Sequence, residues 1–378
     1  MGFWRRGAVI WLCTWALTPA QGSPYSDFNA GVAANNWKHC DIAIARMTSA
    51  LSMPGLLDNL KVPALIVRAQ CRARDKNYEG AAADLDAALA LKPDDYDAHM
   101  YRGSVRMVLK EPAVAEQDFD ALIRIRPDLA TGRILLARYY LAEKRFDAAI
   151  EQYTVMVGDD DVFGYVLRAK AYFMHGDLDR ALADANYLVG IGPKQPLAHL
   201  TREVIYEARG DFSRALSDIN EAMDDGADGP EQERQKGVVL WKMGRFSDAG
   251  DSFRRAIKGD PKSGYNLMWL NLSRLDDDEP DRELAARAAA VDPSAWPGPL
   301  LAVYTGQSTP DAALKAAAAG DADDLDRNAC EADFYIGAWD VHHDAKDAGR
   351  ALLEQAVKDC PADYVEGYAA SVELKRMK

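Results

Sequence analysis

The fold is decided by residues 81–93, which read AAADLDAALALKP, and by residues 115–127, which read AEQDFDALIRIRP. Both stretches begin with alanine, carry aspartate and then a large apolar residue in the middle, and end on proline, 34 residues apart. A fixed period between about 20 and 50 residues is typical of stacked repeat architectures. The sequence therefore predicts a chain of repeated helix pairs.

The same register extends through most of the 378 residues. Pro93 and Pro127 lie 34 residues apart, and both Pro193–Pro261 and Pro293–Pro361 are separated by twice that period, 68 residues. Close contact between two helices needs small side chains at one position and large ones to fill the gap at another. The small column is Ala81, Ala115, Ala149, Ala181, Ala215 and Ala249, and the large column is Leu85, Phe119, Tyr153, Ile219 and Phe253, with Ala185 in the fourth repeat.

Short polar segments predict the turn between the two helices of each repeat. A glycine or polar residue ends the first helix, and an apolar residue opens the packing of the second. These turns are Lys76-Asn77-Tyr78, Lys144-Arg145-Phe146, Gly176-Asp177-Leu178, Gly210-Asp211-Phe212 and Gly244-Arg245-Phe246.

Charged pairs support the register independently, because an arginine in the first helix is followed 16 residues later by an aspartate in the second. The pairs are Arg68 with Asp84, Arg102 with Asp118, Arg168 with Asp184, and Arg202 with Asp218. In the third repeat both partners are uncharged, Leu136 and Gln152, whereas Lys236 with Ser252 breaks the rule. We expect these positions to face each other between paired helices.

The pattern resembles the tetratricopeptide repeat, whose small first-helix residue falls at Ala69, Gly103, Ala137, Ala169 and Gly237. The resemblance implies an all-α superhelical solenoid of antiparallel helix pairs with a helical C-terminal cap. Glu203 and Trp269 depart from it, which predicts a loose fifth repeat and a distorted seventh.

The resulting organisation has five segments. We expect a signal peptide at residues 1–20, a degenerate N-terminal helical unit at 25–61, the repeat array at 62–294, a linker with short helices at 295–328, and a C-terminal repeat-like unit with a capping helix at 329–378. The last segment is similar to the end of NlpI-type repeat proteins of bacterial envelopes, through Trp296-Pro297, Cys330-Glu331-Ala332, Phe334-Tyr335, Cys360-Pro361 and Glu373-Leu374-Lys375-Arg376. That resemblance implies a periplasmic adaptor that docks envelope proteases and cell-wall hydrolases.

The N-terminus has the features of an export signal. Arg5 and Arg6 precede an apolar run from Gly7 to Leu17, and Thr18-Pro19-Ala20 offers a small-residue cleavage site. Eleven apolar residues are too few to span a bilayer, although an uncleaved anchor is the alternative. Cleavage would make the net charge of −14 two units more negative, so we expect no binding to nucleic acid and no membrane insertion. The expected location is the periplasm.

Four cysteines remain after cleavage, Cys40, Cys71, Cys330 and Cys360. An even number in an oxidising compartment predicts disulfides, and the simplest pairing is Cys40–Cys71 and Cys330–Cys360. The alternative is four buried thiols.

A binding surface is predicted at the second, fifth, ninth and twelfth positions of each repeat, which face the inside of a tetratricopeptide superhelix. The residues are Met100, Ser104, Met107, Ile134, Arg138, Leu141, Val166, Lys170, Phe173, Leu200 and Trp241. This mostly apolar set would suit a helix or extended peptide segment with hydrophobic anchors. The alternative is that these side chains only pack the superhelix.

Signatures of chemistry are missing from the sequence. It contains no Gly-x-x-x-x-Gly-Lys loop, no Gly-x-Ser-x-Gly elbow and no His-Glu-x-x-His helix, so no catalytic residue, metal site or cofactor is predicted. Adjacent residues such as His342 and His343 point about 100° apart on a helix and cannot share one ion. The leading hypothesis is a non-enzymatic scaffold that binds other proteins; the alternatives are a self-associating structural protein, or an enzyme built around Asp340 and His342.

Overall fold

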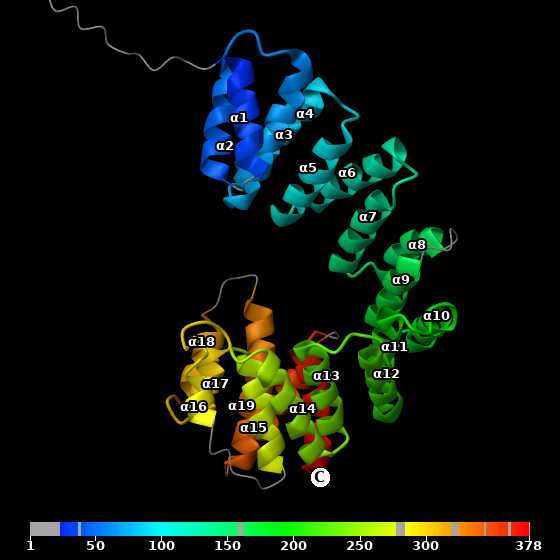
Figure 1. Cartoon of the computed structure of the whole chain (residues 1–378), viewed down its shortest axis with the longest axis vertical. Coiled ribbons are helices and arrows are strands. Elements are labelled where there is room, and N and C mark those ends of the chain that lie inside the picture. The colour runs from blue at the N-terminus through cyan, green and yellow to red at the C-terminus, as the bar shows by residue number, and fades with distance from the viewer. Residues whose placement is uncertain are drawn as a thin grey trace, which may run out of the picture. The chain divides into compact units, whose positions relative to one another are not determined.

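The computed structural model describes residues 23–36, 39–157, 162–276, 284–319, 324–343, 345–361 and 364–377. These ranges contain 21 helices and no strand, which confirms the predicted all-α fold (Figure 1). None of these helices combines the length and apolar composition that spanning a bilayer requires. The predicted signal peptide, residues 1–20, lies outside the described ranges.

The chain divides into two compact units, residues 1–144 and 145–378. Unit 1 contains α1 (Pro24–Asn36), α2 (Cys40–Ser52), α3 (Asp58–Arg74), α4 (Tyr78–Leu91), α5 (Tyr96–Val108), α6 (Pro112–Ile125) and α7 (Ala130–Ala142). Successive helices pair across short turns, so that α1 packs on α2, α3 on α4 and α5 on α6.

Unit 2 continues the helix-pair pattern and ends in a larger helical cluster. Its repeat helices are α8 (Phe146–Val157), α9 (Val162–His175), α10 (Leu178–Ile191), α11 (Pro196–Ala208), α12 (Phe212–Asp224), α13 (Pro230–Lys242), α14 (Phe246–Gly259) and α15 (Gly264–Asp276). The cluster adds α16 (Leu284–Ala288), α17 (Gly298–Tyr304), α18 (Pro310–Ala317), α19 (Leu325–His342), α20 (Lys346–Asp359) and α21 (Val365–Arg376).

The predicted turns lie where the helices end. Each tight turn needs one residue with positive φ, which is supplied by Lys76 at 60° between α3 and α4 and by Gly176 at 84° between α9 and α10. Glycine adopts this conformation without strain. The side chain of Asn77 then accepts a hydrogen bond from the backbone N–H of Gly80 and caps the start of α4.

The small and large columns meet inside the helix pairs as predicted. All six column alanines are completely buried, and the five large residues are at most 2% exposed. A Cβ atom at Gly103 would lie 2.6 Å from Cε1 of Phe119, and one at Gly237 would lie 2.7 Å from Cε1 of Phe253. The first helix thus needs a very small residue wherever an aromatic ring from the second helix crosses it.

All four predicted arginine–aspartate pairs form. Arg102 donates from Nε and Nη2 to the two oxygens of Asp118 at 2.9 and 2.8 Å. Two donors on two oxygens match the planar fork of guanidinium to the carboxylate. The same two-bond geometry holds Arg68 on Asp84, Arg168 on Asp184, and Arg202 on Asp218.

The array ends in a core that also includes the expected linker region. Leu300, Leu301 and Val303 of α17 are buried in one hydrophobic cluster with residues of α13, α14, α15, α19, α20 and α21. Trp269, which replaces the small residue of the seventh repeat, is completely buried there and stacks on Phe253 with ring centroids 5.9 Å apart. After α15 the described chain resumes with α16; residues 277–283 lie outside the described ranges, so the distortion of the seventh repeat stays a prediction.

One predicted disulfide is present and the other is not. Cys330 in α19 and Cys360 at the end of α20 are bonded, with Cα atoms 5.0 Å apart. Cys40 and Cys71 are buried free thiols, so the bridge expected between them is wrong. Cys71 donates instead to Oδ1 of Asn35 at 3.3 Å, and burial, reinforced by Cys40, raises the pKa of the Cys71 thiol to about 12. A thiol that resists deprotonation is a poor partner for disulfide formation.

Candidate functional site

The predicted binding positions belong to what we call the helix-A surface of each unit, the second, fifth, ninth and twelfth residues of α5 and α7 in unit 1 and of α9, α11 and α13 in unit 2. The ninth positions Ser104, Arg138 and Lys170 are exposed. The apolar residues at the fifth and twelfth positions are partly exposed at Met100, Met107, Ile134, Leu141, Val166 and Leu200. Phe173 is 8% exposed, and Phe163 and Leu197 at second positions are half exposed.

Trp241 does not belong to this exposed surface, and its assignment there is wrong. The side chain is completely buried, and its ring makes edge contacts with Trp269 and Phe334 at centroid distances of 5.3 and 6.4 Å. The guanidinium of Arg376, at the end of α21, lies over the same ring at 4.3 Å. The C-terminal helices therefore cover the helix-A surface at α13, as the red α21 beside α13 shows in Figure 1.

A cavity of about 590 Å³ lies next to this covered point, within unit 2. Four repeat helices form one wall, since α9, α11, α13 and the start of α15 all contribute side chains. The first turns of α19 and of α21 form the opposite wall. The lining residues are Phe173, Glu203, Val204, Glu207, Ala208, Glu231, Arg234, Gln235, Val238, Ser263, Tyr265, Arg327, Glu331, Tyr364, Val365, Glu366 and Tyr368.

Most of the first wall follows the repeat register. Val204, Glu207, Glu231, Arg234, Val238 and Tyr265 occupy helix-A positions of their repeats, equivalent to those predicted at α5, α7 and α9. Among the predicted residues themselves, Phe173 lines the cavity and the others do not. Glu203 was visible in the sequence only as a departure from the small-residue rule, Glu331 only as part of the C-terminal resemblance, and no sequence signal marked Glu366.

Acidic side chains outnumber basic ones around the cavity, with five glutamates and two arginines in its lining. Glu231 pairs with Arg234, and Glu207 pairs with Lys242 behind the wall. Arg327 pairs with Asp324 on its own helix. Within the described residues, Glu203, Glu331 and Glu366 have no basic partner at salt-bridge distance, although all three are at most 6% exposed.

The electrostatics of these three carboxyl groups reflect that burial. Burial and the adjacent Glu207 raise the pKa of Glu203 well above its ordinary value. Burial also raises the pKa of Glu331, although hydrogen bonds from the Tyr265 hydroxyl and the Trp296 indole, at 2.7 and 2.6 Å, oppose the change. Burial, followed by the charge of Glu331, raises the pKa of Glu366 to about 7. Carboxyl groups with strongly shifted pKa values are found preferentially at functional sites, so their presence in a cavity marks it as a candidate site.

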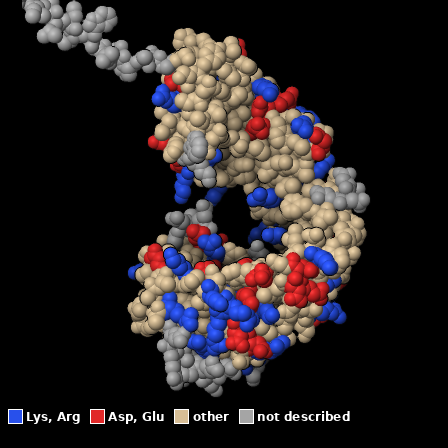
Figure 2. Space-filling model, viewed as in Figure 1, with Lys and Arg blue, Asp and Glu red and all other residues tan. Residues whose placement is uncertain are grey.

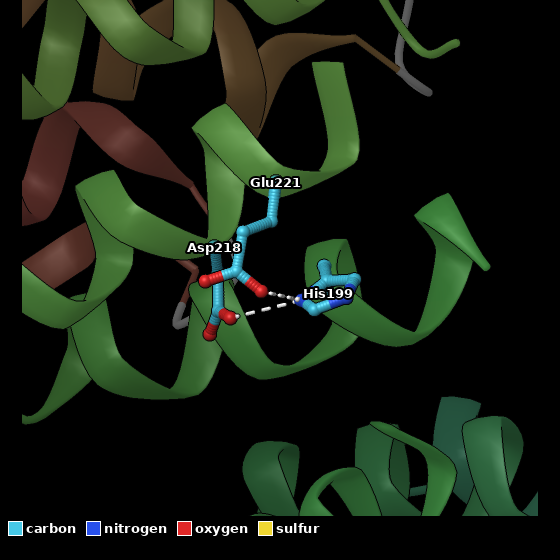
Figure 3. Close-up of side chains that lie close together, drawn as sticks. All are labelled: His199, Asp218 and Glu221. Carbon is cyan, nitrogen blue, oxygen red and sulfur yellow. Dashed lines mark hydrogen bonds and ion pairs between the residues drawn. The ribbon is translucent and has the colours of Figure 1, made fainter. Parts of the chain in front are cut away.

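A second cluster, at the junction of α11 and α12, brings together His199, Asp218 and Glu221 (Figure 3). Nδ1 of His199 lies 3.1 Å from Asp218 and 3.4 Å from Glu221, while Nε2 lies 2.9 Å from the carbonyl of Pro193. A carbonyl only accepts hydrogen bonds, so Nε2 carries a proton. Arg202 already binds both oxygens of Asp218.

The same arrangement occurs one hundred residues earlier. His99 contacts Asp118 at 2.7 Å and the carbonyl of Pro93 at 2.8 Å, and Arg102 binds that aspartate. The position of Glu221 is occupied there by Ala121. A guanidinium on the shared carboxylate disfavours a metal ion, and the repetition without a third ligand indicates an ion-pair network that ties each proline loop to its helix pair.

The residues of the enzyme hypothesis and the neighbouring histidine differ in their contacts. Nε2 of His342 lies 3.9 Å from Glu373, whereas the ring of His343 stacks on Trp339 at 3.4 Å. Burial raises the pKa of Asp340, and the histidine that opposes this change is His343.

Comparison with known proteins supports the repeat assignment. A family model described as tetratricopeptide repeat matches residues 67–130 and 134–196. No curated protein matches the chain. A tetratricopeptide repeat protein from Parabacteroides merdae is 16% identical, with a TM-score of 0.50, over 66% of this chain and 98% of its own.

Two further solved structures are more distant. PilF of Pseudomonas aeruginosa is 14% identical over 55% of this chain and 96% of its own, with a TM-score of 0.41. PilW, a type IV pilus biogenesis factor, is 16% identical over 56% and 98%, with a TM-score of 0.44. At such identities a likeness concerns the fold alone. The helix pairs, their shared register and the family match show that the chain contains tetratricopeptide repeats at residues 67–130 and 134–196.

Proposed function

We propose that the chain is a non-enzymatic scaffold that binds a polypeptide segment of a partner protein along the helix-A surface. The observation that carries this proposal is the exposure of apolar side chains at repeated positions. Met100, Ile134, Val166 and Leu200 occupy the same place in four repeats, and each remains partly open to solvent. Repeat proteins use surfaces built from recurring positions to bind extended partners.

The chemistry of the surface points to an apolar segment with an occasional acid. In unit 1, Met100 and Met107 lie on α5, and Leu141 lies with the exposed Arg138 on α7. Methionine is flexible and polarisable, so it adapts to differently shaped anchors. On the face drawn in Figure 2, the surface over α1–α3 is mainly uncharged, and charges of both signs are intermixed over α13–α15.

We further propose that the protein works outside the cytoplasm, in the bacterial periplasm, with recruitment of an envelope protease or cell-wall hydrolase as its task. Support comes from the signal-like residues 1–20 and from the Cys330–Cys360 disulfide, since such bonds persist in oxidising compartments. The C-terminal resemblance to NlpI-type proteins supports the same role. N-terminal sequencing of the chain released by osmotic shock is expected to begin just after Ala20; a chain retained in the cytoplasm with Met1 intact would contradict the location.

Site-specific photocrosslinking in cells tests the binding surface. Photoreactive residues at Met100 in unit 1 and at Val166 in unit 2 are each expected to capture a partner polypeptide, because both replace fifth-position residues. The matched control is Ile191 on α10, which is 51% exposed but lies on the second helix of its pair. Equal capture from Ile191, or no specific adduct at either test position, would argue against the helix-A surface.

A further inference from the structure

The cavity between α11, α13, α19 and α21 presents an excess of hydrogen-bond acceptors. Both bonds to Glu331 end on Oε2, and the bond to Glu366, from the Tyr335 hydroxyl at 3.4 Å, ends on Oε1. These side-chain bonds do not involve Oε1 of Glu331 or Oε2 of Glu366. Glu203, 2% exposed, adds a third buried carboxyl group to the same lining.

An uncharged acceptor in the cavity gives an independent indication. The side-chain amide of Gln235 donates from Nε2 to Glu231 at 3.4 Å, which fixes its orientation. Its Oε1 atom is buried and has no hydrogen-bond partner among the described residues. A buried acceptor without a donor destabilises a protein, and Oε1 of Gln235 would gain a hydrogen bond from a donor that enters the cavity.

We propose that this cavity binds a cationic, multiply donating group, a guanidinium or primary ammonium, carried by an arginine or lysine side chain of the bound polypeptide. The inference rests on the proposed function, because it assigns a specific anchor to the partner that the helix-A surface holds. A free amine or guanidine offers the same chemistry and is the second possible source. Arginine fits best, since its five N–H donors can reach several carboxylates at once.

The position of the cavity makes this anchor compatible with a bound segment. Val204 is 42% exposed at the ninth position of α11, and it also lines the cavity, so the cavity opens onto the helix-A surface. A volume of about 590 Å³ accommodates a long basic side chain together with parts of its neighbours. The charged head would lie near Glu331 and Glu366, while its stem contacts Val204 and Val238.

Binding is expected to depend on pH, because the cation favours ionised carboxylates. The groups that influence Glu366 are Glu331 on α19, and Arg234 and Lys242 on α13. The Tyr335 hydroxyl of α19 donates a hydrogen bond to Glu366, and the Tyr265 hydroxyl of α15 donates one to Glu331. With a pKa of about 7 in the unliganded chain, Glu366 is mostly ionised at pH 8 and mostly protonated at pH 6. Affinity should therefore fall as the pH is lowered through 7.

Isothermal titration calorimetry on the full mature chain tests the proposal. The probe is the peptide acetyl-Gly-Leu-Arg-Leu-Gly-amide, and its control replaces arginine by citrulline, a neutral side chain of nearly the same shape. At pH 8 the arginine peptide is expected to bind at least tenfold tighter than the citrulline peptide, with a smaller ratio at pH 6. Equal affinities at pH 8 would overturn the proposal without any variant having to fold.

Variants then assign the effect to the cavity. Glu331→Gln and Glu366→Gln should each reduce affinity for the arginine peptide at least tenfold and leave citrulline binding unchanged. The matched control is Glu373→Gln, which removes another buried carboxylate of α21 that pairs with Arg376 and does not line the cavity. An unchanged arginine preference in both cavity variants would overturn the assignment.

Agmatine, which carries a free guanidinium, distinguishes whether the cavity binds a side chain of a polypeptide or a free cation. Binding of agmatine as tight as that of the arginine peptide would assign the cavity to a free cation and overturn the peptide anchor, whereas much weaker binding supports it. The two proposals also fail separately. Crosslinks at Met100 and Val166 without an arginine preference would support the scaffold function and rule out the cationic anchor. An arginine preference without these crosslinks would support cation binding by the cavity and argue against partner binding along the helix-A surface.

Discussion

At the scale of single residues, the buried charges of the array form a repeated network. Asp118 receives Arg102 and His99, and Asp218 receives Arg202 and His199, in the same geometry. Each histidine also joins the carbonyl of a proline that ends the previous repeat. A carboxylate with several donors tolerates burial because its lost hydration is replaced by directed bonds. These networks connect neighbouring repeats rather than only the two helices of one repeat.

His199 should make stability depend on pH. Burial of the ring opposes its charged form, but the Pro193 carbonyl, Asp218 and Glu221 outweigh burial and raise the pKa of His199. A raised folded-state pKa stabilises the fold fully below the unfolded value of about 6.5, and this contribution disappears as the pH rises through the folded-state pKa. His199→Gln should destabilise by about 1.5–3 kcal/mol at pH 5.5 and by less once the pH exceeds the folded-state pKa of His199.

Urea denaturation of the wild type and of His199→Gln, followed by circular dichroism from pH 5 to 9, measures this difference. The control is His175→Gln, since His175 is exposed and lies 3.8 Å from an exposed aspartate. A stability difference that grows with increasing pH would show that the charged imidazole is not what stabilises the loop.

The arginine–aspartate pairs should differ sharply from surface pairs in their contribution to stability. Asp118 is 1% exposed, and its removal in Asp118→Ala leaves Arg102 and His99 without their shared acceptor. We expect a loss of about 3 kcal/mol or more, as for one partner of a buried pair. Asp147, 94% exposed, should change stability by less than about 0.5 kcal/mol when replaced by alanine. The midpoints of urea unfolding of the Asp118→Ala and Asp147→Ala variants measure this difference in stability. Similar losses of stability in both variants would contradict the expected difference between buried and exposed pairs.

At the scale of helices, packing depends on which residue faces the large column. Gly103 lies under Phe119, so a Cβ atom would meet the ring at 2.6 Å. Gly190, also helical, is exposed on α10, and a Cβ atom added there would have no neighbouring atom within 4 Å. The same substitution should therefore act in opposite directions at the two sites.

Gly103→Ala is expected to destabilise by about 1–3 kcal/mol through overpacking, and Gly190→Ala to stabilise by about 0.5–1 kcal/mol through reduced backbone freedom in the unfolded chain. Thermal unfolding measures both. The double variant Gly103→Ala with Phe119→Leu should recover part of the loss, because leucine removes the clashing edge of the ring. Equal effects of alanine at both glycines would refute the packing argument.

Elements set by local pattern were predictable from the sequence, and contacts between distant segments were not. The helix pairs, their turns at Lys76 and Gly176, and the four ion pairs all depend on residues within one repeat. Trp241 was misplaced because its environment is made by α21, 135 residues away in sequence. The Cys40–Cys71 bridge was wrong because spacing shows that two cysteines lie on neighbouring helices, but not that hydrogen bonds and burial keep them as thiols.

Of the two walls of the cavity, one could be predicted from the sequence and the other could not. The repeat register indicates the wall formed by α9, α11 and α13, because helix-A positions recur. The opposite wall comes from Glu331 and Glu366, which belong to helices with no fixed register relative to the array. Only the packing of the C-terminal core, around Trp269 and Phe334, brings the two walls together.

At the scale of the whole molecule, the second unit depends on a covalent link. The Cys330–Cys360 bond closes a loop over 30 residues and holds the end of α20 at α19, one of the helices that line the cavity. A loop of this size corresponds to roughly 3–4 kcal/mol of stabilisation through the unfolded state. Reduction should therefore lower the unfolding temperature of unit 2.

Dithiothreitol and the variant Cys330→Ala with Cys360→Ala should lower this temperature by similar amounts, as followed by tryptophan fluorescence from the core around Trp241. The reductant should have no further effect on the variant, since Cys40 and Cys71 are already thiols. A wild-type chain that unfolds at the same temperature with and without reductant would refute the contribution of the bond.

The late closure of the cavity affects how the protein matures. Synthesis proceeds from the N-terminus, so α11 and α13 emerge from the ribosome more than 120 residues before Tyr364, Glu366 and Tyr368. Until α21 has been synthesised, Arg376 cannot pack on the ring of Trp241, and the cavity lacks the side chains that α21 contributes. A nascent or truncated chain would therefore expose apolar surface and an incomplete cavity to chaperones. Only the full-length chain could bind the proposed cationic side chain.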